Sequence, residues 1–250
     1  MKKLLQFELR RLLRFKAAIV CLIINFVYVL INAYLSNLDL FNLEDGVGTP
    51  ALPLMLDGMD MIPMLVSIFA ALYACNDYSN NTLKNIYSKG FERRDVYLSK
   101  MICLVAYCVA ICLVGWIGSF LGGVIFCGVG SANGNFFLAI LASLLAVIAY
   151  ASICFMFATF FKKTGTGVAM SILGPMLIAI VLGLIDVIFI RNNIDFLLTE
   201  YWIPGYYERL TFYFPAFHSA KILTIAFIMS VVYAAGSTLL GLLIVKRQDI

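Results

Sequence analysis

Charged residues and histidine are scarce in this sequence, and their scarcity excludes whole classes of protein. Only 13% of the residues are charged, whereas 63% are hydrophobic. Soluble domains carry about twice that charged fraction, so the composition is that of an integral membrane protein. The one histidine, His218, has no Ser, Cys or acidic motif beside it, so a structural role is expected for it rather than a catalytic one.

Motifs for catalysis and metal binding are also missing. The chain has no HExxH, no EExxR-like pair and no GxSxG elbow, which argues against an intramembrane enzyme. The seven cysteines contain no CxxC pair and lie in or beside apolar segments, where burial is expected. The phosphate-binding pattern GxxxxGK(S/T) is absent as well. The chain is therefore not expected to hydrolyse ATP, and no cofactor is expected in it.

Long apolar runs make up most of what is present. A helix rises about 1.5 Å per residue, so roughly 20 residues cross a hydrocarbon core of about 30 Å. Backbone groups cannot stay unpaired in lipid, and the runs lack the alternation of barrel strands, so helices are predicted. The predicted fold is an all-α integral membrane domain over 1–250. Its six predicted spans are 17–35, 59–75, 101–127, 136–160, 168–190 and 222–245.

Lysine and arginine fall almost entirely on one side of these six spans. If the N-terminus is cytoplasmic, fifteen of the 18 basic residues lie on the cytoplasmic side. The other three are Arg191, Arg209 and Lys221. This distribution predicts a multi-pass protein of the cell membrane with both termini in the cytoplasm. Because the basic residues lie beside spans, anionic lipid rather than nucleic acid is their expected partner.

Two segments flank the first span. Residues 1–16 are predicted to form an amphipathic helix in the headgroup layer, with Leu5, Leu9, Leu12 and Leu13 on one face. A basic flank that only orients the first span is the alternative. The segment 36–58, predicted to be extracellular, has four acidic residues and no basic one. It is interpreted as a solvated loop, with a docking surface for a cationic substrate as the less favoured alternative.

Small and polar residues inside the spans are expected to pack helices against one another. Gly118 and Gly122 form a GxxxG pair, and Asn25 is expected to hydrogen-bond to a neighbouring helix. The Gly174–Pro175 pair predicts a kink in the fifth span. A stripe of alanines follows helical spacing in the fourth span: Ala139, Ala142, Ala146 and Ala149.

Two features mark the predicted outer side of the last spans. Asp186, near the outer end of the fifth span, is either a functional residue or one that simply faces water. The segment 191–221 is long for a connection and rich in aromatic residues. Such rings favour the membrane interface, so this segment is predicted to lie on the outer leaflet or to dip partly into it.

The longest polar and basic stretch, 76–100, separates the second and third spans. Thr82 suits the start of a helix, and Gly90 suits the left-handed residue that ends one. Between them, Leu83, Ile86 and Tyr87 recur at helical spacing and predict a short cytoplasmic helix with an exposed apolar face. An amphipathic loop resting on the membrane is the alternative.

The run from Asp77 to Lys84, followed by Arg93, Arg94 and Lys100, resembles the segment after the second span in membrane subunits of type-2 ATP-binding-cassette exporters. Their pattern is an acidic residue, a tyrosine or phenylalanine, polar residues, Gly-Thr, an amphipathic helix, and then Arg and Lys. This chain has Asp77 for the usual glutamate and Asn81 for the glycine. Asparagine tolerates the same left-handed backbone. With six spans and an interfacial helix, the resemblance extends over nearly the whole chain.

The resemblance implies a permease subunit whose short helix is a coupling helix, docked on a separate ATPase subunit that binds the ATP. It also implies a second identical or similar permease chain, and short extracellular helices within 191–221. Small chains of this plan resemble exporters of peptide antibiotics, bacteriocins or toxins and the associated immunity and antibiotic-resistance systems. The implied docking residues are Thr82, Leu83, Lys84, Ile86, Tyr87 and Lys89. The candidates for gating or coupling are Asp77, Arg93, Arg94 and Asp186.

Other functions compete with this one. An ion-coupled secondary transporter would need ionisable residues at mid-membrane, where the spans offer little besides the off-centre Asp186. A membrane scaffold without transport activity is a further alternative. A lipid or a small drug could replace a peptide as the cargo.

Overall fold

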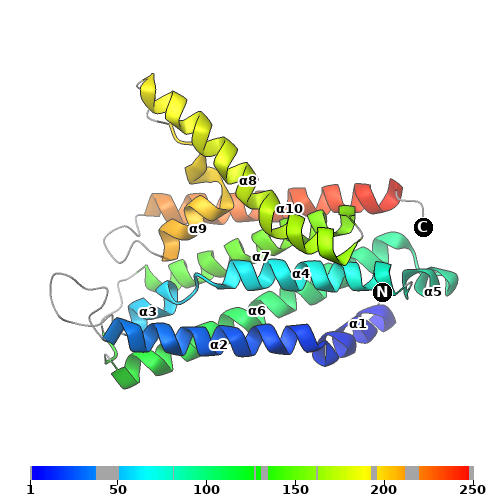
Figure 1. Cartoon of the computed structure of the whole chain (residues 1–250), viewed down its shortest axis with the longest axis horizontal. Coiled ribbons are helices and arrows are strands. Elements are labelled where there is room, and N and C mark those ends of the chain that lie inside the picture. The colour runs from blue at the N-terminus through cyan, green and yellow to red at the C-terminus, as the bar shows by residue number, and fades with distance from the viewer. Residues whose placement is uncertain are drawn as a thin grey trace.

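The computed structural model describes residues 2–37, 51–80, 82–126, 128–130, 135–161, 163–192, 196–211 and 220–247. All regular elements in these ranges are helical, which confirms the all-α prediction for the described part of the chain (Figure 1). The elements are α1 (Lys2–Arg14), α2 (Lys16–Asn37), α3 (Ala51–Asp57), α4 (Ile62–Ser79), α5 (Thr82–Ser88), α6 (Arg93–Phe126), α7 (Phe136–Phe161), α8 (Thr164–Arg191), the 3-10 turn η1 (Thr199–Tyr201), α9 (Ile203–Thr211) and α10 (Ala220–Arg247).

Five of the helices, α2, α6, α7, α8 and α10, are each long and apolar enough to cross a membrane. Helices α3 and α4 meet at a 44° bend and together could make a sixth crossing. The chain is therefore a multi-pass membrane protein. Helix α1, α5 and the end of α10 lie at one end of the bundle, and α3 and α9 lie at the other (Figure 1).

The expectation of a solvated loop over 36–58 is wrong for its second part, which forms α3. Ala51, Leu54 and Leu56 are completely buried, and this burial draws the segment into the bundle. Pro53 lies in the first turn of α3, where its missing N–H group has no helical partner to lose. The acidic residues Asp39, Glu44 and Asp45 lie outside the described residues.

Helices α4 and α7 form the centre of the bundle. Phe69 and Tyr73 of α4 are fully buried and stack on each other with ring centroids 5.5 Å apart. All four alanines of the stripe in α7 are fully buried, as expected for close helix packing. Gly118 and Gly122 of α6 face α2, where an added Cβ would meet Phe26 and Ala33 respectively. Asn25 of α2 donates a hydrogen bond to the Ile111 carbonyl oxygen of α6 at 3.1 Å, which confirms its predicted role between helices.

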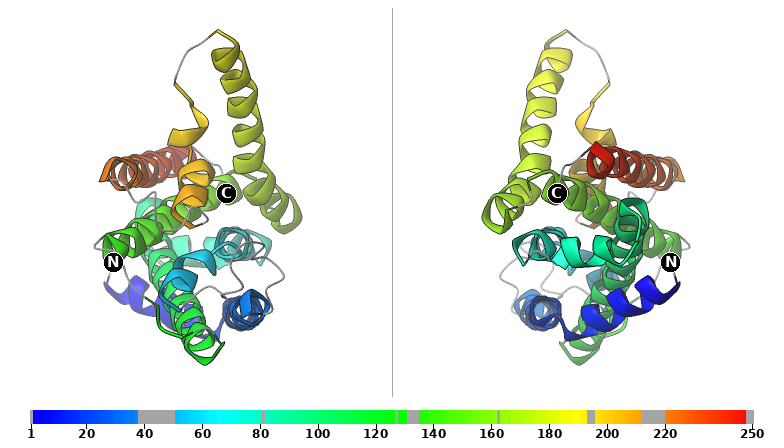
Figure 2. Two further views of the ribbon diagram at one scale, coloured as in Figure 1. Left: turned by 90° about the vertical axis from the view of Figure 1, so that its left-hand side faces the viewer. Right: turned by 90° about the vertical axis from the view of Figure 1, so that its right-hand side faces the viewer.

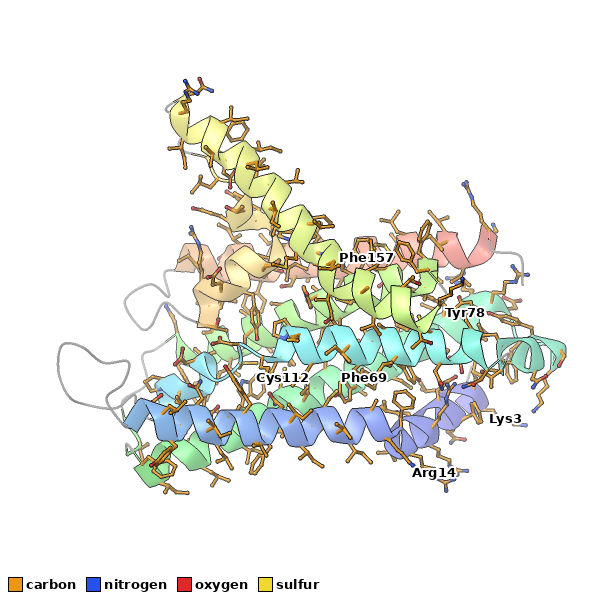
Figure 3. The ribbon with its side chains drawn as sticks, viewed as in Figure 1. Lys3, Arg14, Phe69, Tyr78, Cys112 and Phe157 are labelled. Carbon is orange, nitrogen blue, oxygen red and sulfur yellow. The ribbon has the colours of Figure 1, made fainter. Side chains whose placement is uncertain are left out.

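Helix α8 is the least buried of the long helices. Only 17% of its apolar window is buried, compared with 56% for α7. Figure 2 shows α8 extending away from the other helices and changing direction along its length, in line with the Gly174–Pro175 pair inside it. Phe157 of α7 packs beside Gly174, and Figure 3 labels it near that crossing. Much of α8 is therefore left as an apolar surface.

The N-terminal helix α1 has three faces instead of the two that the sequence suggested. Leu4, Glu8 and Leu12 point into the bundle and are almost fully buried. Leu9 and Leu13 are exposed, and they form the apolar face that an interfacial helix would turn toward lipid. Lys3 and Arg14 extend away from the bundle on the remaining basic face (Figure 3).

Candidate functional site

The short helix predicted between the second and third spans is α5, bounded by turns on both sides. Gly90 has φ +83°, so it adopts the left-handed conformation expected for the residue that ends this helix. Asp95 lies in the first turn of α6, where a negative charge suits the positive end of the helix dipole. Local sequence signals therefore determine both the end of α5 and the start of α6.

The apolar face of α5 packs against the chain itself, which corrects the expectation that it is exposed. Leu83 is only 4% exposed and lies in a small cluster with Leu4 of α1 and Val96 of α6. Ile86 and Tyr87 are half-buried against the same cluster. Helices α1 and α6 supply apolar surface at this point, so burial of Leu83 inside the subunit is more favourable than exposure to water. In this structure Leu83 therefore packs inside the subunit, and its docking role stays a prediction.

The opposite face of α5 is polar and open. Asn85 and Ser88 are exposed, and Lys89 and Arg94 continue this surface beyond the helix. Asn85 is not among the residues predicted from the sequence, although its position on the helix, opposite Leu83, would have pointed to it. Lys84 has its side chain outside the described part of the structure.

Arg93, one of the predicted coupling residues, caps the apolar cluster instead of extending into solvent. Its guanidinium carbon lies 5.9 Å from the centre of the Tyr87 ring, within the range of a cation–π contact. Tyr78, labelled in Figure 3 near α5, packs against the same cluster. Arg93 therefore links the start of α6 to the side of α5.

Asp77, at the end of α4, is the centre of a buried polar cluster. Its carboxylate is fully shielded from solvent and accepts hydrogen bonds from residues of three other helices. Arg11 Nη2 of α1 lies 2.5 Å from Oδ1, and the Thr82 hydroxyl of α5 donates to the same oxygen at 2.7 Å. Lys100 Nζ of α6 donates to Oδ2. One side chain thus joins α1, α4, α5 and α6.

Glu8 of α1 forms the second half of this cluster and was missed by the sequence reasoning. It is completely buried, and its Oε2 accepts a hydrogen bond from the Tyr73 hydroxyl at 2.7 Å. Arg11 Nη1 lies 3.7 Å from the same oxygen, so Arg11 bridges Glu8 and Asp77. Glu8 is the single acidic residue within the basic segment 1–16, and this feature could have indicated a buried ion pair.

The charges in the cluster balance, since two carboxylates face two cations. Burial lowers the pKa of the Arg11 guanidinium, but the hydrogen bond and negative charge of Asp77 outweigh that effect and leave the pKa above its ordinary value. Lys100 Nζ also lies 4.9 Å from the Tyr73 ring centre. Removing one of the four charged side chains would leave a buried charge without its partner, which is strongly destabilising. We name this group, Glu8, Arg11, Tyr73, Asp77, Thr82 and Lys100, the Asp77 cluster.

Asp186, the remaining coupling candidate, lies far from α5 and holds the connection after α8. It is 4% exposed, and it accepts hydrogen bonds from the backbone N–H groups of Leu198 and Thr199 at 2.7 and 2.9 Å. The Thr199 hydroxyl donates to it at 2.6 Å. Asp186 therefore does not face water, and in this structure it fixes the start of η1.

Three aromatic residues of the segment 191–221, which is predicted to lie at the interface, pack inward against the bundle. Trp202, Tyr206 and Tyr207 are 7%, 1% and 6% exposed. Trp202 Nε1 donates to the Pro175 carbonyl oxygen of α8, and the Tyr207 hydroxyl donates to the Met59 carbonyl oxygen beside α4. These internal acceptors satisfy the polar ends of the rings and make burial favourable. The rest of the aromatic stretch, 212–217, and His218 lie outside the described residues.

Comparison with known protein families identifies the family to which this helical bundle belongs. A family model described as an ABC-2 family transporter protein matches residues 4–186. The chain belongs to the ABC-2 transporter family. The match begins in α1, includes α5 and the Asp77 cluster, and ends at Asp186 in α8. No curated protein matches the chain. As an ABC-2 protein it is a membrane component of an ATP-binding-cassette transporter, and membership of this family implies partner ATPase subunits.

Proposed function

We propose that this chain is the permease subunit of an exporter, and that a separate ATP-binding-cassette ATPase docks on the exposed face of α5. The single observation that carries the proposal is the bonding of Asp77, which connects α5 to α1, α4 and α6. A force applied to α5 would then move three further helices together instead of bending a loop. The gating candidates Asp77 and Arg93 act here as mechanical links.

The docking surface in this proposal is the polar side of α5 and the turn after it. Asn85, Ser88 and Lys89 are exposed, and Arg94 adds a second positive charge. Ile86 and Tyr87 contribute only their half-buried edges, while Thr82 is engaged with Asp77. Lys84 belongs to the docking set by resemblance alone. The proposed docking site thus lies on α5, as the sequence predicts, but on the polar face of this helix instead of the apolar one.

Transport would require a second copy of this chain, or a similar one, to complete the pathway. Helix α8 has long rows of exposed apolar side chains and little burial within the subunit, and the other chain and lipid would cover it. Since basic residues gather at the α5 end, that end would face the cytoplasm with both termini. The cargo inferred by resemblance is a peptide antibiotic, bacteriocin or toxin, exported directly or as part of self-immunity.

Co-purification with the ATPase encoded beside the chain tests docking. The double variant Asn85→Glu and Lys89→Glu reverses the charge of the proposed surface without touching the buried face of α5. We expect the recovered ATPase to fall about tenfold or more, since a clash of charges at an interface costs several kcal/mol. Arg191→Glu, an equally exposed basic residue at the other end of the bundle, is the matched control and should leave recovery unchanged. Full recovery with the double variant would refute docking on this face.

A further inference from the structure

A cavity of about 230 Å³ lies at the end of the bundle opposite α5. Its walls come from the start of α4, the middle of α7 and the whole length of α9. Most of the lining is apolar or aromatic, including Tyr150, Ile203 and Tyr207, while two carboxylates, Asp60 and Glu208, also line it. Because these acids come from segments far apart in sequence, the fold itself brings them to one cavity.

The two carboxylates lack basic partners within the part of the chain that the structure describes. The ion pairs found there involve Glu8, Asp77 and Glu200, and neither Asp60 nor Glu208 takes part in one. Oδ1 of Asp60 is shielded from solvent and accepts no hydrogen bond from the described residues. A shielded carboxylate oxygen without a donor is costly, so Asp60 is suited to meet a donor supplied from outside the chain.

Two hydroxyl groups of the cavity lining already donate hydrogen bonds within the chain. The Tyr207 hydroxyl donates to the Met59 carbonyl oxygen at 2.8 Å. The Thr211 hydroxyl donates to the Tyr207 carbonyl oxygen at 3.1 Å. The lining also offers a ligand two carboxyl groups beside apolar walls and two tyrosine rings, and tyrosine rings attract cations to their faces. The cavity lining therefore favours a ligand that has a positively charged group attached to an apolar part.

The size of the cavity limits what can enter. A cavity of about 150 Å³ is known to hold one benzene molecule. About 230 Å³ thus suits one small amine or one long side chain, and it is too small for a folded peptide.

We propose that this cavity binds an ammonium or guanidinium group together with its apolar stem, as part of the molecule that the transporter moves. Asp60 would bind the charged group from the buried side, Glu208 would bind it at the exposed mouth, and Tyr150 and Tyr207 would pack on the stem. This inference depends on the proposed function in one respect, namely that the bound molecule is the cargo of the transporter. It narrows the cargo to cationic, partly apolar compounds.

Binding of phenethylammonium to the purified chain, in nanodiscs of neutral phosphatidylcholine, tests the site by calorimetry. The neutral probe phenethyl alcohol has the same body without the charge. We expect the ammonium to bind about tenfold or more tightly than the alcohol, since a hydrogen bond to a charged group contributes about 1.5–3 kcal/mol. Asp60→Asn and Glu208→Gln should each abolish most of that preference. Glu200→Gln, which removes an acid at the same end but outside the cavity, should retain it.

Several results would overturn the site. Equal binding of both probes, an unchanged preference in Glu208→Gln, or full competition by an equal concentration of sodium ion would each do so. Glu208 is exposed, so its variant remains informative even if Asp60→Asn does not fold. Competition by the tripeptide Ala-Lys-Ala, compared with Ala-norleucine-Ala, separates a peptide side chain from a small free amine as the source of the cation. No ATPase is present in this assay, so its failure would leave the docking test untouched.

Discussion

Replacing Asp77 by asparagine is expected to destabilise the bundle at its α5 end. Asparagine has nearly the same shape but no charge, so Lys100 would remain buried without an anion. Arg11 would keep only its longer 3.7 Å contact with Glu8. Two opposite charges about 4 Å apart attract each other by roughly 4 kcal/mol at an effective dielectric constant near 20. Breaking such a buried pair from one side typically costs about 3–5 kcal/mol.

A second substitution distinguishes this electrostatic cause from a loss of shape. In Asp77→Asn combined with Lys100→Met, the unpaired cation is gone and an apolar chain of similar length fills its place. Replacement of a buried ion pair by apolar groups is often neutral in stability. The double variant should therefore recover most of the lost free energy, which a double-mutant cycle measures as a favourable coupling between the two positions.

Thermal unfolding of the chain in nanodiscs measures both effects. For a chain of this size about 1 kcal/mol corresponds to roughly 2–4 °C, so Asp77→Asn should lower the Tm by about 6–20 °C. Glu92→Gln, an exposed acid beside α5, serves as the control and should change little. The reasoning fails if Asp77→Asn unfolds at the temperature of the natural chain, or if the double variant is no more stable than the single one.

Three further substitutions test other contacts. Gly241→Ala would place a methyl group against Tyr97 Oη and should cost about 1–3 kcal/mol in unfolding experiments, whereas Gly236→Ala, with open space around it, should be neutral. Tyr207→Phe removes the hydrogen bond to Met59 and should cost about 1 kcal/mol in the same assay; no loss would mean that the bond does not hold α9. Asp186→Ala removes all three hydrogen bonds to 198–199, so hydrogen exchange at these amides should accelerate about tenfold or more, and unchanged exchange would refute the anchoring role.

Features that depend on local chemistry could be predicted from the sequence. The helix after the second span, its end at Gly90 and the buried alanine stripe of α7 all follow from spacing and backbone preference. The GxxxG pair in α6 likewise packs against α2, because small residues at that spacing leave room for another backbone. In these cases the signal lies within a few residues of the feature.

Features that depend on distant partners could not be predicted in this way. The apolar face of α5 looked exposed because Leu4 and Val96, which cover Leu83, are remote in sequence. Burial of Glu8 required the knowledge that Tyr73 and Asp77 lie beside α1. Asp60 and Glu208 meet at one cavity only because α9 packs against α7 and its Tyr207 reaches the Met59 carbonyl oxygen in the turn before α4. Hydrophobic pattern alone does not determine which helices become neighbours.

Site-specific cross-linking gives the most direct test of whether the ATPase docks on α5. A photo-reactive maleimide would be attached to Asn85→Cys on the exposed face of α5, or to Val129→Cys, which is exposed at the opposite end. Leu83→Cys is the control for the buried face, and the natural chain gives the background from its own cysteines. The ATPase should be captured from position 85, and not from positions 83 or 129. Equal capture from 129, or none from a labelled 85, would contradict the proposal that the ATPase acts on the chain through this helix.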